Sequence, residues 1–385
     1  MSLPRAAAAA LLCAAAAAPT SVRAACPNRG SWPTDGWPSI AGQVATQRQA
    51  EIAALESYAF TLSGKDEERL GLRTDGLVII KNGQIVYERY ARGWDAAKPH
   101  IAWSVTKSVT NALVGVAKVR GALSEDDKIS KYVTITNPDS RAADITIRNL
   151  MEFSSGFDWR EAYEHESYQV SSVLAMLYGV GHKDAVKFVT SHPLRDAPGT
   201  SWDYSTGDST LLSSVVTAAM VPSFGEDFAF DLLFSPIGMK TAVLERDPRG
   251  GSFGGSYLYA TPQDLARFGY LYLSDGCWAG ARVLPDGWVA ASTATVAPPF
   301  RLKVIHPDNE PTGWQWWLNQ AVPEQSIATR PWPDVPGDAY AAEGHWGQRI
   351  IVVPSQDVVI VRTGDDRNAT MSVNDLASKA LAVAR

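Results

Sequence analysis

Ser104 and Lys107 form the arrangement in this chain whose residue types point most directly to chemistry. Side chains at positions i and i+3 of a helix share a face, so the lysine amine can lie beside the serine hydroxyl. A serine is a weak nucleophile until a base takes its proton, and partial desolvation lowers the pKa of a lysine enough to help. A helix beginning at Ser104 would also direct backbone N–H groups at developing negative charge. The pair predicts attack on a carbonyl carbon. The alternative is a solvent-facing lysine on an ordinary amphipathic helix.

Tyr204 is the second candidate. It lies in a turn-rich segment, residues 198–208, directly before a run with a helical pattern over residues 209–219. A phenol in that position can face a cleft and relay a proton between nucleophile and leaving group. Taken alone, Tyr204 is more typical of a half-buried aromatic residue whose hydroxyl contacts water. We predict a catalytic role for it because Ser104 and Lys107 are also present.

The third candidate segment is Gly344-His345-Trp346-Gly347-Gln348, which leads into a predicted hairpin. A glycine beside a strand lets the backbone approach a substrate closely. The N–H of Gln348 could then be one oxyanion donor and the N–H of Ser104 the other. Taken alone, His345 is more typical of a structural surface histidine.

Strands near both ends of the chain, with helices between them, must position these residues. Residues 77–80 and 84–87 predict a hairpin that turns at Asn82-Gly83, and residues 349–353 and 358–361 predict another. Apolar spacing predicts helices over three further ranges: 46–62, 104–120 with Gly121 as its stop, and 372–383.

These elements predict an α+β fold in a single domain over residues 46–385. An antiparallel sheet lobe flanked by helices would come from about 46–124 and 251–385, and a mostly helical lobe from about 125–250 would be inserted into it. Gly250-Gly251 and Gly254-Gly255 predict a turn where the chain returns to the sheet lobe. A cleft between two such lobes is a favoured ligand site.

Composition excludes several classes of protein. The chain has 385 residues, a net charge of −6, 45% hydrophobic and 20% charged residues, which are ordinary globular values. An acidic chain without a basic block is a poor nucleic-acid binder. Its three cysteines include no Cys-x-x-Cys pair, and His165, His182 and His192 lack metal-like spacing. We therefore expect neither a metal nor an organic cofactor.

Residues 1–25 have the composition of a signal peptide. Arg5 precedes an apolar run over residues 6–18 that is too short to span a bilayer. This predicts a secreted or periplasmic protein without stable membrane insertion after cleavage. A retained anchor is the alternative. Residues 26–45 would form an irregular arm, and the remaining Cys26 and Cys277 could pair in an oxidising compartment, which the sequence leaves open.

Together these segments resemble the penicillin-recognising serine hydrolases, which include class C β-lactamases, D,D-peptidases, and related esterases and nylon-oligomer hydrolases. The resemblance extends over residues 46–385, including three further stretches: 146–156, 235–239 and 260–269. It implies a β-lactamase/D,D-peptidase-like fold that needs no cofactor. It also implies that Ser104 is the acylated nucleophile, Lys107 its partner in proton transfer, and Tyr204 a second general acid or base. His345-Trp346-Gly347 would take the place of the family's Lys-Thr-Gly strand.

Two departures from the family pattern bear on the substrate. Tyr204-Ser205-Thr206 stands where the lactamases have Tyr-x-Asn, so the amide that binds a substrate amide is missing. His345 and Trp346 replace a permanent cation and a small hydroxyl residue, and a histidine is mostly neutral at pH 7. We therefore expect a small-molecule ester or amide substrate of the 6-aminohexanoate-dimer-hydrolase or esterase type. The alternatives are a β-lactamase or D,D-peptidase, and a catalytically silent ligand-binding module on the same fold.

The chain contains 13 tryptophans, a large aromatic load. Aromatic side chains bury large areas anywhere in a protein, so core packing is the default interpretation. Trp103, Trp202 and Trp346 are neighbours of the three candidate segments, and we expect these rings to line the cleft.

Overall fold

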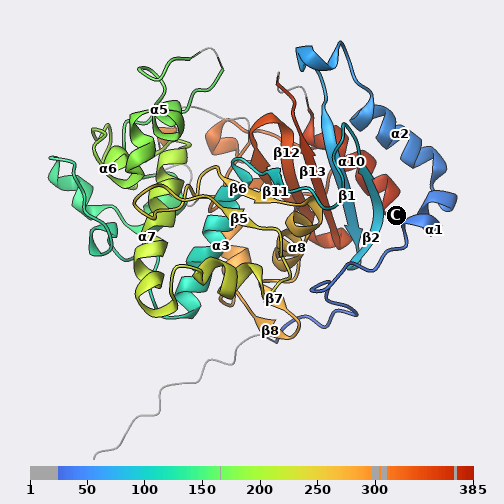
Figure 1. The fold of residues 1–385 in the computed structure, drawn as a ribbon, viewed down its shortest axis with the longest axis horizontal. Helices are drawn as coiled ribbons and strands as arrows, with labels where there is room; N and C mark the ends of the chain where they lie inside the picture. Colours follow the sequence, from blue (N-terminus) through green and yellow to red (C-terminus); the bar gives the residue numbers. More distant parts are fainter. Residues whose placement is uncertain (1–24, 165, 297–302, 305–309, 368–370) are drawn as a thin grey trace, which may run out of the picture.

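The computed structural model describes residues 25–385 apart from 165, 297–302, 305–309 and 368–370, so the predicted signal peptide lies almost wholly outside the described residues. Figure 1 shows a sheet lobe beside a lobe of helices. The sheet has six antiparallel strands in the order β10-β11-β12-β13-β1-β2. Its strands are β1 (Thr74–Lys81), β2 (Gln84–Tyr90), β10 (Trp317–Leu318), β11 (Tyr340–Gly344), β12 (Gln348–Val353) and β13 (Val358–Gly364).

Both predicted hairpins are present, as β1–β2 and β12–β13. Asn82 and Gly83 have φ angles of 51° and 75°, the positive values that a tight two-residue hairpin turn requires. β1 pairs with β13, so Ile79 lies opposite Ile360 and the sheet is built from both ends of the chain.

Both faces of the sheet are buried because successive side chains point to opposite faces. In β1, Val78 and Ile80 pack into one core and Leu77 and Ile79 into the other. The helices α8 (Pro262–Leu273) and α3 (Val105–Val119) cover the first face. The second face carries α1 (Ala41–Gln47), α2 (Gln49–Phe60) and α10 (Val373–Val383) (Figure 1).

The predicted limits of the first helix were wrong. The arm is helical from Ala41, and the segment predicted as one helix from Thr46 is two, because Arg48 leaves helical geometry at φ −124° and ψ 38°. The helix at Ser104 is correct, with Ser104 at its N-cap. The last helix is also correct, and Ser372 caps it by accepting from the N–H of Asp375.

The helical lobe packs against α3 through its longest helix, α7. It contains α4 (Ile147–Met151), α5 (Ser172–Tyr178), α6 (Ala185–Thr190) and α7 (Thr206–Phe224). Their starts follow from the sequence, because a Ser, Thr or Asp side chain caps each one. Within the described residues, no helix has the length and apolar character needed to cross a bilayer.

Shorter elements complete the fold. They are β3 (His100–Ile101), β4 (Ser201–Trp202), β5 (Val243–Leu244), β6 (Leu258–Ala260), β7 (Cys277–Trp278), β8 (Ala281–Arg282), β9 (Lys303–Val304) and α9 (Trp288–Ser292).

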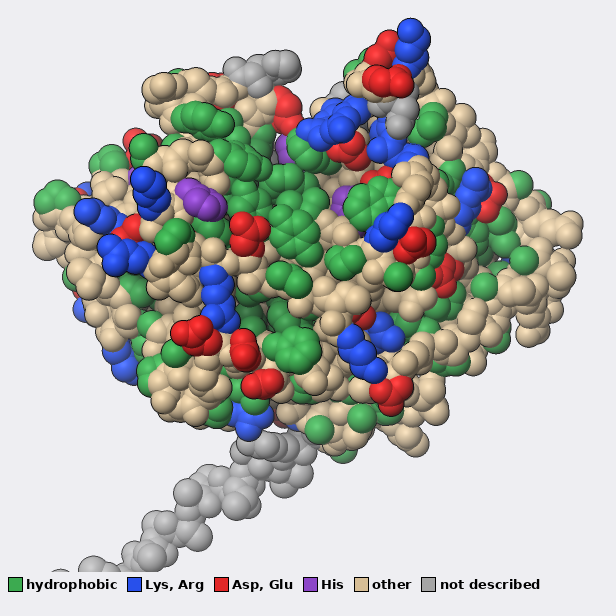
Figure 2. All heavy atoms as spheres, viewed as in Figure 1, with side chains coloured by type: hydrophobic (Ala, Val, Ile, Leu, Met, Phe, Trp, Pro, Cys, Tyr) green, Lys and Arg blue, Asp and Glu red, His purple; other side chains and the backbone are tan. Residues whose placement is uncertain are grey.

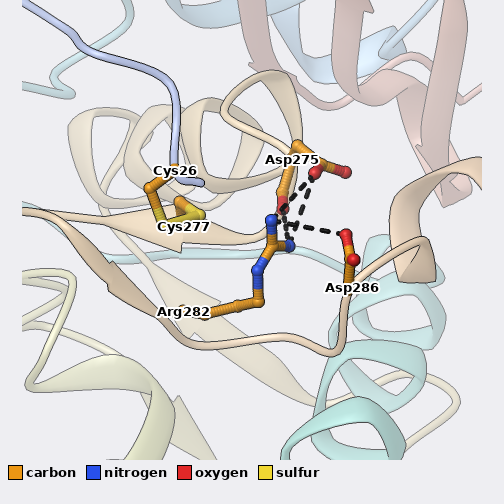
Figure 3. The surroundings of a disulfide bond; sticks show 5 residues. All are labelled: Cys26, Asp275, Cys277, Arg282 and Asp286. Atoms are coloured by element: carbon orange, nitrogen blue, oxygen red, sulfur yellow. Dashed lines mark hydrogen bonds and ion pairs between the residues drawn. A yellow bond between two sulfur atoms is a disulfide. The ribbon is translucent and has the colours of Figure 1, made fainter. Parts of the chain in front are cut away.

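A disulfide joins Cys26 in the N-terminal arm to Cys277 in the β7–β8 hairpin, so the pairing that the sequence left open is present (Figure 3). On the same hairpin, Arg282 forms ion pairs with Asp275 and Asp286. The arm is therefore fixed to the sheet lobe across 251 residues of chain.

We expect a Cys26→Ser, Cys277→Ser double variant to unfold with a free energy lower by about 2–5 kcal/mol, because the disulfide restricts the unfolded chain. Urea unfolding of the oxidised protein measures this loss. Reductant should lower the stability of the wild type and leave that of the variant unchanged. An unfolding midpoint that is the same in both proteins would contradict the prediction.

Candidate active site

Ser104 lies at the N-cap of α3, where backbone N–H groups point toward it. The residue before it, Trp103, has φ 46°, a left-handed conformation that costs energy for a non-glycine residue. Hydrogen bonds hold this strained turn: Thr106 Oγ1 donates to the carbonyl of Trp103, and the N–H of Leu258 in β6 donates to Thr106 Oγ1. The surrounding structure therefore fixes the position of Ser104.

Lys107 is buried and donates hydrogen bonds of 2.8 Å to Ser104 Oγ, Thr206 Oγ1 and the Gly255 carbonyl. Burial lowers the pKa of Lys107 to about 8, and the negative charge of Glu161 opposes part of that shift. At neutral pH, a usable fraction of the lysine is therefore the amine that can accept a proton from Ser104.

Tyr204 lies two residues before α7, and its ring centroid is 4.9 Å from Lys107 Nζ. Phe153 packs against one side of the ring and Trp317 stacks on it at 5.6 Å. The three predicted catalytic residues therefore come together, although Tyr204 lies far along the chain from Ser104 and Lys107.

A narrow cavity of about 10 Å³, roughly the volume of one water molecule, is shared by these residues. Its described walls are Ser104, Lys107, Phe153, Tyr204, Thr312, Gln315, Trp316, Trp317 and Glu343. Figure 2 shows apolar side chains gathered in a hollow between the two lobes.

The structure adds Thr206, Gly255 and Glu161 to the site, none of which we predicted. Thr206 takes the place of the family's Tyr-x-Asn asparagine. Its hydroxyl accepts a hydrogen bond from Lys107 and is not left open for a substrate. Gly255, expected in a simple turn, lies against α7, where a Cβ would come within 2.8 Å of the Thr206 backbone. The motif position was a signal for Thr206, whereas nothing local pointed to Glu161.

His345-Trp346-Gly347 lead directly into the last hairpin, as predicted, and their correspondence to the family's Lys-Thr-Gly stays a prediction. These residues form the tight turn between β11 and β12, because Trp346 and Gly347 have φ angles of 59° and 89° that a strand does not accept. Glu343 and Gly344, at the end of β11, lie near the nucleophile: Glu343 lines the cavity, and a Cβ on Gly344 would meet the carbonyl of Ala102 at 2.3 Å.

The turn reaches across to the helical lobe. His345 Nε2 and Trp346 Nε1 both lie 2.8 Å from Glu164 Oε1, and Tyr163 stacks on the His345 ring at 4.6 Å. Burial lowers the pKa of His345, and Glu164 opposes part of that shift. The histidine is therefore neutral at pH 7 and supplies no fixed cation.

Gln348 begins β12 opposite Gly344 and is buried. Its side chain joins the turn to β13, with Nε2 donating to the Gly364 carbonyl and Oε1 accepting from the Gly364 N–H. It is not among the described residues that line the cavity, so its role as an oxyanion donor stays a prediction.

The tryptophans that line the cavity are Trp316 and Trp317, and Trp316 is also buried in the core, which is the default interpretation for the tryptophans. Trp103, Trp202 and Trp346 are not among the described walls of this small cavity, so their role in lining the wider cleft stays a prediction. Trp202 packs behind Phe153, edge to face. Trp103 packs edge to face against Trp346.

Histidines elsewhere make structural contacts. His182 stacks on Phe253, and His192 Nδ1 lies 2.9 Å from the carbonyl of Phe188. His165 lies outside the described residues. Across the described chain, no group of three or more His, Cys, Asp or Glu side chains is arranged to hold a metal ion.

Comparison with known proteins assigns the chain to a family. A family model described as Beta-lactamase matches residues 62–383. The chain belongs to the beta-lactamase family. Proteins of this beta-lactamase family are generally serine hydrolases.

Individual relatives are distant. A 6-aminohexanoate-dimer hydrolase of Paenarthrobacter ureafaciens is 22% identical over 252 residues, and the match spans 63% of each chain. A penicillin-binding protein of Bacillus halodurans has a TM-score of 0.60 at 13% identity, over 86% of this chain and 99% of that one. A beta-lactamase of Mycobacterium bovis has a TM-score of 0.57 at 17% identity, over 86% and 97%. The solved structures support the fold of this beta-lactamase-family chain, not a substrate.

Proposed function

We propose that the protein is a serine hydrolase that cleaves an ester or amide through a covalent acyl-enzyme on Ser104. The observation that carries the proposal is the buried Lys107 amine, 2.8 Å from Ser104 Oγ at the start of α3. An adjacent base is what converts a serine hydroxyl into a nucleophile.

In the proposed acylation, Ser104 Oγ attacks the carbonyl carbon while Lys107 takes its proton. The oxyanion is held by the N–H of Ser104 and a second backbone N–H, for which Gln348 is the candidate. Tyr204 gives a proton to the leaving group as the carbonyl–leaving-group bond breaks. Water then attacks the ester, loses its proton to the same groups and releases the acid, which restores Ser104.

For the substrate, we propose an uncharged or extended ester or amide of the 6-aminohexanoate-dimer-hydrolase and esterase type. Aromatic rings form much of the cavity wall, and its described walls contain one cation, Lys107, which is already bound to three acceptors. Glu343 also lines the cavity, and its carboxylate pairs with Arg349 at 2.9 Å, so that arginine is engaged too. These features disfavour a penicillin, whose carboxylate needs a fixed cation.

A serine-directed fluorophosphonate probe followed by a substrate panel tests the proposal. We expect one adduct, at Ser104, and faster turnover of a chromogenic ester and a linear amide than of a cephalosporin. Absence of an adduct would overturn the enzyme assignment and favour a silent binding module. Cephalosporin turnover exceeding ester turnover would favour a β-lactamase or D,D-peptidase instead.

Tyr204→Phe should lower kcat/KM by about 10²-fold or more, because it removes one proton-transfer group and keeps the ring that packs on Trp317. The loss should be largest for substrates with poor leaving groups, which need protonation most. Kinetics on a pair of esters with different leaving-group pKa values measures this. A variant with unchanged rates would remove Tyr204 from the mechanism.

We also propose that the protein works outside the cytoplasm. The Cys26–Cys277 disulfide supports this, because such bonds form and persist in oxidising compartments. The proposed signal peptide predicts the same location, and fractionation of cells that express the full chain tests it.

A further inference from the structure

The carboxylate of Glu161 has an unusually complete set of donors. Its Oε2 accepts from Trp159 Nε1 at 2.7 Å and from the N–H of Thr206 at 2.9 Å. Its Oε1 accepts from Thr206 Oγ1 and from the Tyr163 hydroxyl, each at 2.5 Å. Four donors on one carboxyl group match its ionised form, because an ionised carboxylate only accepts hydrogen bonds.

Lys107 presents the opposite pattern. Its three contacts are all to oxygen atoms, and the carbonyl of Gly255 can only accept. The Thr206 hydroxyl donates to Glu161, so it accepts from Lys107 Nζ at 2.8 Å. A single hydroxyl therefore joins a buried ammonium group to a partly buried anion, and the direction of each hydrogen bond is fixed by the chemistry of the two ends.

We propose that Glu161 is a positioning residue that acts through Thr206, orienting the Lys107 amine toward Ser104 and setting the pH at which that amine becomes available. The inference rests on the proposed acylation of Ser104. Glu161 itself is not among the described residues that line the cavity at Ser104.

Several other titratable groups lie around the hydrogen-bond chain from Lys107 through Thr206 to Glu161. Tyr204 faces Lys107, and Tyr163 and His345 lie beyond Glu161, stacked on each other. Glu343 lines the same cavity. Asp208, one turn into α7, has its pKa raised to about 7 by burial but binds Ser155 rather than Lys107. Glu161 differs from all of them because its charge reaches Lys107 through one bridging hydroxyl.

The sign of the effect follows from charge. The anion favours the ammonium form of Lys107, so loss of the anion lets the amine form persist to lower pH. In Glu161→Gln, the rate of Ser104 labelling by the fluorophosphonate should keep its acid-side dependence but shift it to lower pH by about one unit or more. If the plateau rate falls and the pH profile does not move, the substitution has only altered the packing, and the role of Glu161 is overturned.

A matched control is Glu166→Gln, which removes a carboxylate of the same segment that pairs with the partly exposed Arg160. Its pH profile should equal that of the wild type. Thr206→Val removes the bridging hydroxyl and should also move the profile to lower pH, whereas Thr206→Ser restores the hydroxyl and should restore the profile.

The outcomes separate the two proposals. If wild-type Ser104 is not labelled at any pH, the proposed function fails. If the wild type is labelled and Glu161→Gln keeps its pH profile, the function stands and the role of Glu161 is overturned. If Glu161→Gln does not fold, a wild-type profile in Thr206→Val overturns the role instead.

Discussion

Ser104→Ala should abolish covalent labelling and lower kcat/KM on the preferred ester on the order of 10⁴-fold or more, because it removes the atom that forms the acyl-enzyme. The effect should be large for every substrate, since no described neighbour can replace a nucleophile fixed by the strained Trp103 turn. Intact-mass analysis after probe treatment and steady-state kinetics measure the two losses.

Two controls belong with this variant. Ser378→Ala removes an exposed hydroxyl of α10, far from the site, and should change neither labelling nor rate. The unfolding midpoint of Ser104→Ala should match that of the wild type, which separates lost chemistry from lost folding. Residual labelling of Ser104→Ala at the wild-type rate would place the nucleophile elsewhere.

Lys107→Met should lower kcat/KM by about 10²- to 10⁴-fold, since it removes the proton acceptor and keeps a side chain of similar length. In the wild type, the base is the deprotonated amine, so the rate should rise with pH through about 8 and level off above it. The variant should lose this acid-side dependence. A pH series of kcat/KM on one ester measures both changes.

Lys107→Arg completes the test of the lysine. Arginine keeps a cation beside Ser104 but does not give up its proton at the pH of the assay, so its activity should be as low as that of Lys107→Met. High activity in the arginine variant would mean that the cation, not the base, is what the site needs. A rise near pH 8 that persists in Lys107→Met would assign it to another group.

The parts of the fold that the sequence predicted well are those encoded by neighbouring residues. Asn82-Gly83 requires positive φ and so predicts its own hairpin turn, and the Ser104–Lys107 spacing predicts one face of a helix. Tyr204 could not be predicted from its neighbours alone. Only its position along the chain after Ser104 and Lys107 distinguished it from other aromatic residues.

What could not be predicted depends on contacts between distant residues. Glu161 reaches Lys107 only because α7 places Thr206 between them. The Trp317 ring lines the cavity because the short β10 pairs with β11, which nothing in the Trp314–Trp317 segment indicates. The tight turn at His345–Gly347 depends on the positive φ of Trp346, which nothing in the sequence before the predicted hairpin indicates.

The pairing of β1 with β13 has a consequence for how the chain is made. A ribosome synthesises the β1–β2 hairpin first, and the strand that covers its open edge emerges only after the whole helical lobe. Until then Leu77 to Ile80 present an apolar edge that is prone to pair with other chains. Contacts so far apart in sequence also form slowly. The nascent protein therefore exposes this edge until β13 has been made, and the sheet lobe cannot be completed before then.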